Sequence, residues 1–580
     1  MGRPFLKEIS LDRSFFNKPS SVAWPTEFLL HLLQALSGSR HIIKKTTMIE
    51  RMTWERLLSS KRVSQFETCT KPSASSQFDD PRHDFERDCD QIVFSYPFRR
   101  LQDKTQVIPF PKYDFVHTRL THSLEVASVG RSLGKLVAPR ILIELGQDFV
   151  NRTKLCSSDL GALVAGACLA HDIGNPPFGH SGEDSISYYF KQHSTQLKPR
   201  YDFSNLVKED ENYFHFKPWS NAKPEQNEVF RKIDYIKQVK FHEDLSKFEG
   251  NANGFRILTQ NCDRGINPTA ALLGTFSKYP RESYIHESPF KNSPKPPKGL
   301  TKYGVFQSER QIFEEVAEEL GLLKQSGISE YDLAYHRHPL CYLMEAADDI
   351  AYGIIDFEDG CRLGIIDFEK EYRSIKLLTK KNKYEDVEIN SSPLKILVDI
   401  AELDKAFDMT RVQNAPDFKQ AISYLRAKVI NVLIHQCFEI FDRNYENIMT
   451  GNYLNALIDD IDNQTIITSL KKMKALVRKY VYNYPPVLQS EASGFEVMSH
   501  LIESFAVSSN LCFSCGDVES EKLEKLSSLL PDEYRPSTEK ELATLTQEEV
   551  YLRLMRVMDY VSGMTDNYAT SIYRTIKGIN

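Results

Sequence analysis

Cysteine is scarce in this sequence, with ten residues in a chain of 580. That number is too small to build a disulfide scaffold at this length, which excludes the heavily cross-linked class of secreted domains. Cys512 and Cys515 form the one closely spaced pair, and no second pair follows at the spacing of a zinc site. Chance spacing explains this pair best, with a metal or redox role as the alternative. The cysteine content therefore favours a reduced, cytoplasmic protein.

Long apolar runs are also missing. No run reaches the roughly 18 residues that a membrane-spanning helix needs. Charges interrupt residues 1–21, where a signal peptide would carry its apolar stretch. The formal net charge is −6, so the chain lacks the overall positive charge that is typical of proteins binding nucleic acid or acidic membranes. We expect a soluble protein with no membrane partner.

Helical periodicity, in contrast, is abundant. From Phe85 onward, apolar residues recur at three- and four-residue spacing, and strand patterns are few and short. The periodicity weakens between about 201 and 300. We predict a mainly α protein with room for a small β-hairpin around 300–306. A helix beginning near Arg119 is expected to end at Pro139, since proline disrupts a helix interior.

Four titratable residues follow one of the most apolar helices. The stretch "LGALVAGACLAHDIGNPPFGHSGE", residues 160–183, ends with His171, Asp172, His180 and Glu183. A divalent cation explains why such groups are tolerated beside so many apolar side chains. A capped helix with a solvated His–Asp pair is the simpler alternative from this stretch alone.

Two further apolar helices carry polar residues. "RLTHSLEV" places His122 inside an apolar helix, where a hydrogen-bonded core histidine is the plain interpretation. "LMEAADDIAYGIIDFED" places Asp348, Tyr352 and Asp356 four residues apart, on one helix face. Buried carboxylates on an apolar helix are rarely left without a partner. These two segments therefore favour the cation over the capped helix.

Six segments together resemble a known family. They are "FRRLQDKTQV", "RLTHSLEVASVGRSLG", "AHDIGNPPFGHSGE", "FEGNANGFRILT", "LMEAADDIAYGIIDFED" and "SGMTDNYA". The order H…HD…D resembles the HD-domain metal phosphohydrolases, and the longer segments resemble the deoxyguanosinetriphosphate triphosphohydrolases, or dGTPases. The resemblance implies an HD-domain helical core with additional helical elaborations.

The resemblance also implies a domain organisation. It runs from about Met52 to the C-terminus, so residues 1–51 are expected to be an N-terminal extension without a family counterpart. Residues 52–580 would form the dGTPase-like region. Within it we expect the HD core at about 85–370 and a C-terminal helical region at about 371–580.

Carried over by motif, the resemblance assigns roles to individual residues. The implied metal ligands are His122, His171, Asp172 and Asp348. The implied catalytic residues are His180 and Glu183. The implied triphosphate contacts are Arg119, Lys278, Tyr279 and Lys302, and the implied deoxyribose contacts are Gln106, Tyr352 and Asp356.

The implied activity is hydrolysis of dGTP, or of another dNTP, to deoxynucleoside and inorganic triphosphate with Mn²⁺ or Mg²⁺. Two imidazoles and two carboxylates suit Mn²⁺ better than Mg²⁺. A broader dNTP triphosphohydrolase and another HD-type enzyme, such as a 5′-nucleotidase or cyclic-nucleotide phosphodiesterase, are alternatives, and a nucleotide-sensing scaffold is the non-enzyme alternative.

Family members form symmetric oligomers, often hexamers, so a homo-oligomer is expected. The basic stretch "LKKMKALVRKY" offers a surface for single-stranded nucleic acid, although a solvated helix face is the simpler interpretation.

Overall fold

The fold comes from a computed structural model of the chain. The structure describes residues 50–68, 81–108, 116–196, 206–210, 213–216, 239–260, 266–285, 296–329, 331–379, 392–402, 407–511, 518–535 and 546–579. The chain divides into two compact units, Met1–Glu50 and Arg51–Asn580. Of the expected N-terminal extension, only Glu50 and Arg51 are among the described residues.

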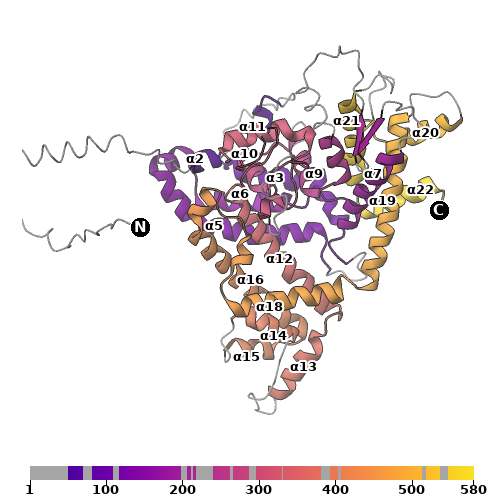
Figure 1. Cartoon of the computed structure of the whole chain (residues 1–580). Helices are drawn as coiled ribbons and strands as arrows, with labels where there is room; N and C mark the ends of the chain where they lie inside the picture. Colours follow the sequence, from indigo (N-terminus) through magenta and orange to yellow (C-terminus); the bar gives the residue numbers. More distant parts are fainter. Residues whose placement is uncertain are drawn as a thin grey trace, which may run out of the picture. The chain divides into compact units, whose positions relative to one another are not determined.

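Two neighbouring helices form the centre of the second unit. They are α5 (Arg119–Thr153) and α6 (Ser157–Ala170), which pack against each other (Figure 1). Helix α6 is apolar on all sides, and nearly all of its side chains are buried. A helix that is hydrophobic all round belongs in a core. Helices α3 (Asp84–Phe94) and α10 (Ala270–Phe276) cover further faces of α6.

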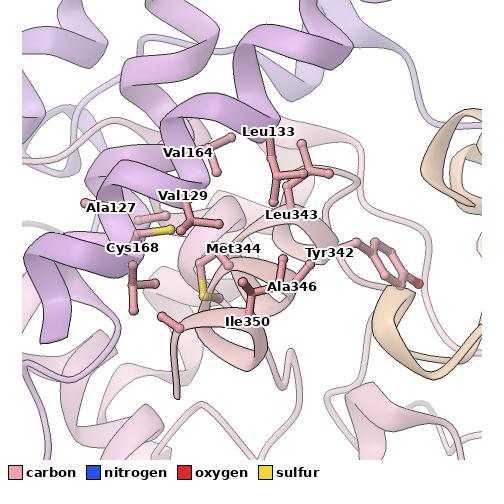
Figure 2. Packing of buried hydrophobic residues seen from close by; sticks show 14 of the residues in the cluster. Ala127, Val129, Leu133, Val164, Cys168, Tyr342, Leu343, Met344, Ala346 and Ile350 are labelled. Carbon is pink, nitrogen blue, oxygen red and sulfur yellow. The ribbon is translucent and has the colours of Figure 1, made fainter. Parts of the chain in front are cut away.

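A third long helix, α12 (Cys341–Arg362), packs across α5 and α6. Figure 2 shows the apolar side chains that meet there, with α5 supplying Val129 and Leu133, α6 supplying Val164 and Cys168, and α12 supplying Leu343, Ala346 and Ile350. All seven side chains are buried, and most are completely inaccessible. Their burial fixes the three helices that carry the predicted site residues.

Helix α5 is longer than the sequence predicts. It continues through Pro139 to Thr153, with Gly146 at φ 76° as the non-helical residue inside it. Val137 and Ile141, on either side of the proline, are buried in the core. This packing outweighs the hydrogen bond that proline removes, so the prediction of a helix end at Pro139 is wrong.

A second apolar cluster joins α7 (His180–Gln196) to the C-terminal helices. Helix α19 (Pro485–Leu511) packs against α7 and against α20 (Val518–Ser528), α21 (Gln547–Ser562) and α22 (Asp566–Lys577). The predicted catalytic residues therefore begin a helix that the C-terminal region supports.

Helices α14 (Pro393–Ile400), α16 (Phe418–Arg443) and α18 (Gln464–Leu476) pack with one another, and α16 and α18 also contact α12. The other α-helices are α2 (Trp54–Leu57), α4 (Tyr96–Arg100), α9 (Gly250–Gln260), α11 (Arg310–Leu320), α13 (Phe368–Thr379), α15 (Phe407–Asn414) and α17 (Tyr445–Met449). Short 3₁₀ turns occupy Val63–Gln65, Leu101–Asp103, Lys298–Leu300, Gln307–Glu309 and Leu457–Asp460, and a π-helical turn occupies Val477–Val481.

The structure confirms a mainly α protein, but its hairpin lies at a different position from the predicted one. Strands β1 (Leu206–Asp210) and β2 (Tyr213–Phe216) pair antiparallel, with Leu206 opposite Phe216. Around 300–306 the chain instead forms the end of a 3₁₀ turn and a single bridge between Glu282 and Val305. The predicted hairpin position is therefore wrong, because the short apolar run there packs beside a loop. No helix in the described ranges is long and apolar enough to span a membrane.

Helix α9 lies in the segment where periodicity is weak, and it crosses the turn after α6 at glycines. A Cβ atom on Gly174 would lie 2.1 Å from both the Gly250 carbonyl oxygen and the Gly254 nitrogen. Real Cβ atoms do not approach backbone atoms so closely. The crossing therefore requires glycine at position 174, and it fixes α9 beside the predicted site.

We predict that Gly174→Ala destabilises the protein by about 1–3 kcal/mol, the cost of overpacking, because two backbone segments must separate. Gly353→Ala is the matched control, since its Cβ would meet only Met473 Cε at an ordinary 3.6 Å. Thermal unfolding of both variants measures the difference. Equal melting temperatures would contradict the proposed close crossing.

Candidate active site

Three of the four predicted metal ligands converge. His122 lies in the first turn of α5, His171 directly follows α6, and Asp348 lies in α12. Asp348 Oδ1 lies 3.4 Å from His122 Nε2 and 3.6 Å from His171 Nε2. One potential ligand atom from each residue lies within 4.8 Å of the others. Residues separated by 226 positions in the sequence thus meet at one point.

The histidine geometry suits a cation. His171 Nδ1 lies 2.6 Å from the Cys168 carbonyl oxygen, which only accepts hydrogen bonds, so in the neutral imidazole Nδ1 carries the proton and Nε2 holds the lone pair. Among the described residues, buried His171 Nε2 has no hydrogen-bond partner. Burial opposes ionisation of Asp348, yet His171, His122 and Lys278 hold the pKa of that carboxyl far below its ordinary value. A divalent cation satisfies such a donor set.

Asp172 lies at the edge of this group. Its Oδ1 is 3.5 Å from His171 Nε2 and also accepts a 2.6 Å hydrogen bond from Asn175. Its Oδ2 accepts a 2.7 Å bond from buried Arg119. Burial alone would raise the pKa of Asp172, but His171 and Arg119 lower it to about 2. The carboxylate is therefore ionised and held in place from both sides.

His180 and Glu183 begin α7 after a tight turn. Phe178 and Gly179 both adopt positive φ, at 61° and 59°, and a Cβ on Gly179 would lie 2.6 Å from Arg119 Nη2. Only glycine allows the guanidinium to pack there. Arg119 thus lies between Asp172 and the residue before His180, which links the two parts of the site.

The two predicted catalytic groups have shifted pKa values. Burial and the Glu249 carboxylate raise the pKa of Glu183 to about 7, although its Oε1 accepts a 2.9 Å hydrogen bond from the Gly250 amide. His180 stays solvent-accessible, and partial desolvation together with Arg119 and Lys302 lowers its pKa. A carboxyl group whose pKa is raised and an imidazole whose pKa is lowered are suited to proton transfer.

The predicted phosphate contacts each face a carboxylate. Lys278 Nζ lies 3.6 Å from Asp348 Oδ2 and 3.8 Å from Glu345 Oε1. Tyr279 is adjacent to it, with its ring centroid 5.9 Å from Lys278 Nζ. Lys302 Nζ lies 3.0 Å from Glu249 Oε2. Lys278 and Arg119 thus place positive charge on the two carboxylates beside the histidines, and Lys302 places it on Glu249.

Of the predicted sugar contacts, Tyr352 lies beside His122. The Tyr352 ring centroid is 6.3 Å from that of His122, with the rings edge to face. Burial raises the pKa of Asp356 to about 7. Gln106 Oε1 is buried, and no described residue hydrogen-bonds to it.

Tyr482 is a site residue that the sequence analysis missed. Its hydroxyl lies 2.8 Å from both the Tyr352 hydroxyl and Asp356 Oδ2. It follows the π-helical turn Val477–Val481, and π-turns are frequent at functional sites. The repeated tyrosines of "KYVYNYP" are the only sequence signal, and they do not identify which one turns inward.

Comparisons with known proteins agree with this geometry. Residues 119–236 match the HD domain, and residues 463–575 match the phosphohydrolase-associated domain. A deoxyguanosinetriphosphate triphosphohydrolase-like protein of Synechocystis is 33% identical over 539 residues, covering 91% of this chain and all of the relative. The chain belongs to the dGTPase-like family of HD-domain proteins.

Other relatives support the same membership. A dGTPase-like protein of Listeria monocytogenes is 31% identical over 541 residues, covering 91% of this chain and all of the relative. The deoxyguanosinetriphosphate triphosphohydrolase of an Enterobacter species is 31% identical over 512 residues, covering 85% of this chain and 94% of the relative. The chain is thus an HD-domain phosphohydrolase related to dGTPases, and membership of this superfamily implies a bound divalent metal.

Two sequence features stay outside this site. The cysteines Cys512 and Cys515 lie outside the described residues. The basic stretch 470–480 covers the end of α18 and the π-turn, and its lysines and arginine are exposed. A role in binding nucleic acid stays a prediction.

We predict that Asp356→Asn changes stability in a pH-dependent way. Because the folded pKa of about 7 lies above the ordinary 3.8, the protonated carboxyl stabilises the fold at low pH. That contribution is lost as pH rises from about 4 to about 7. The melting temperature of the variant minus that of the wild type should therefore increase by a few degrees across this range. Scans in a metal chelator measure it, with Asp442→Asn as control, since the Asp442 side chain near the end of α16 is 49% exposed. A pH-independent difference would contradict the buried neutral carboxyl.

Proposed function

We propose that the protein hydrolyses a deoxynucleoside triphosphate to deoxynucleoside and inorganic triphosphate, with dGTP as the first candidate substrate. The observation that carries this proposal is the convergence of His122, His171 and Asp348 within 4.8 Å. It gains support from family membership over 91% of the chain. A phosphate-binding scaffold without chemistry would not need an imidazole nitrogen kept free at this point.

The metal ligands in this proposal are His122, His171, Asp348 and, at the edge, Asp172. When bound, a divalent cation polarises the α-phosphate and lowers the pKa of a coordinated water. The two imidazoles favour Mn²⁺, while the carboxylates also accept Mg²⁺.

The cationic residues would bind the triphosphate. Arg119, Lys278 and Lys302 each already face a carboxylate that holds them in place, at Asp172, Asp348 and Glu249. Charge-assisted hydrogen bonds from these groups neutralise the phosphates, and Tyr279 adds a hydroxyl. Arg119 is fixed most firmly, because it is buried and packs on Gly179.

The proton would come from His180. Attack of water on the α-phosphorus breaks its bond to the 5′ oxygen, and that oxygen needs a proton to leave as the deoxynucleoside. Protonated His180 donates it, and Glu183 orients the imidazole and returns a proton to it. A Glu183 pKa of about 7 allows the carboxyl to do so near neutrality.

The deoxyribose would lie against Tyr352. The ring at C2′ leaves no space for a 2′-hydroxyl, which excludes ribonucleotides. Asp356 and Gln106 would hydrogen-bond the 3′-hydroxyl. The Tyr482 hydroxyl contacts both Tyr352 and Asp356 and holds their side chains in position. Base preference, a homo-oligomeric state and a broader dNTP range stay predictions.

Product analysis tests the proposal. The wild-type protein is incubated with each of the four dNTPs and with GTP, in Mn²⁺ or Mg²⁺, and both products are identified. We expect deoxyguanosine and tripolyphosphate from dGTP, and little turnover of GTP. Release of pyrophosphate, or of a single phosphate, would place cleavage at another bond and contradict the mechanism.

Two substitutions separate metal binding from proton transfer. Asp348→Ala should abolish bound metal and turnover together, because it removes the carboxylate that both histidines face. His180→Ala should keep the metal and lose on the order of 10²-fold in rate, the scale of a general acid. Metal analysis and rates measure both, with Asp349→Ala as the neighbouring control for metal content. Loss of metal from the His180 variant would make His180 a ligand and overturn its assignment.

A further inference from the structure

The Lys302–Glu249 ion pair lies at the residue before Gly250, whose amide donates a hydrogen bond to Glu183. Lys302 Nζ is 3.1 Å from Glu249 Oε1 and 3.0 Å from Oε2, so it contacts both oxygens. The two partners differ in accessibility: the Glu249 side chain is 9% exposed and that of Lys302 is 40% exposed. One partner is thus enclosed, and the other extends towards solvent.

The enclosed carboxylate is fixed by its surroundings. Asn251 Nδ2 donates a 2.7 Å hydrogen bond to Glu249 Oε1. The next residue, Gly250, donates its amide to Glu183, and a Cβ there would lie 2.7 Å from Glu183 Oε1 and 2.2 Å from Asn175 Oδ1. The backbone after Glu249 therefore cannot move without displacing Glu183.

We propose that Glu249 is a positioning residue that holds the Lys302 ammonium in the free enzyme and releases it to the triphosphate of an incoming nucleotide. The proposal rests on the proposed function, since it assumes a polyphosphate substrate. A lysine on a flexible four-carbon stem moves between acceptors easily, whereas Glu249 is held by Asn251 and the adjoining backbone.

The exchange changes the charge around the proton donor. The charges of Glu249, Lys302 and Arg119 act on the pKa of Glu183, and the same three charges together with Asp172 act on the pKa of His180. Glu249 raises the pKa of both groups, and Lys302 lowers both. When Lys302 moves to the phosphates, Glu249 stays beside Glu183 without its counter-ion. Substrate binding would therefore raise the proton affinity of His180 and Glu183. The two groups would then hold their protons when the leaving oxygen needs one.

Two opposite substitutions test the exchange. Glu249→Gln removes a competitor for Lys302, so inorganic tripolyphosphate should bind about 3–10-fold more tightly by calorimetry, while kcat falls. In a Lys302→Met background the same change should tighten binding by less than about twofold. The pH–rate profile should move to lower pH in Glu249→Gln and to higher pH in Lys302→Met. Lys395→Met is the control, because Lys395 is 40% exposed like Lys302 and pairs with a different carboxylate, Asp399.

Several results would overturn the proposal. They are weaker or unchanged tripolyphosphate binding by Glu249→Gln, equal tightening in both backgrounds, or profiles that shift in the same direction. If Glu249→Gln does not fold, the pH–rate profile of Lys302→Met is the remaining test, because Lys302 is half-exposed and its replacement should be tolerated. An unshifted profile would contradict the exchange. Calorimetry with tripolyphosphate needs no turnover. A wild type that binds it but hydrolyses no dNTP would therefore contradict the proposed function and leave this inference standing.

Discussion

The architecture of the site depends on the cost of burying charge. Asp348, inside α12, lies within a few ångströms of two imidazoles, one in the first turn of α5 and one directly after α6. Desolvated groups of this kind are stable only with a shared partner. The apolar packing of α5, α6 and α12 brings these groups together. The contact between His171 Nδ1 and the Cys168 carbonyl oxygen turns His171 Nε2 towards Asp348 and His122. A single divalent cation satisfies all three groups, and the cationic residues around them suit a polyanionic substrate.

The C-terminal region is part of this architecture rather than an addition to it. Asp566 accepts hydrogen bonds from the amides of Phe178 and Thr105, at 2.9 and 3.0 Å. Buried Lys104 donates to the carbonyl oxygens of Asn175 and Ser562. These bonds hold the strained turn that precedes His180. The phosphohydrolase-associated domain therefore supports the turn before His180, the proposed proton donor, and also supplies Tyr482.

Sequence reasoning predicted the helical class, the family and the convergence of His122, His171 and Asp348, because long motifs and apolar periodicity are local signals. The predictions were wrong or incomplete where tertiary packing determines the local structure. Helix α5 continues through Pro139 because buried residues lie on both sides of it. The hairpin lies at 206–216 rather than at 300–306. Tyr482 reaches the site through a π-turn more than 100 residues beyond Asp356, and no pattern in the sequence predicts that contact.

The most direct test of the shared cation is a crystal of the wild-type protein soaked in Mn²⁺, with anomalous scattering recorded at the manganese edge. We predict one anomalous peak about 2.0–2.3 Å from a nitrogen of His122, Nε2 of His171 and an oxygen of Asp348, with Asp172 as the nearest further oxygen. A peak at another site, or none among these residues in a crystal that binds Mn²⁺ elsewhere, would contradict the account.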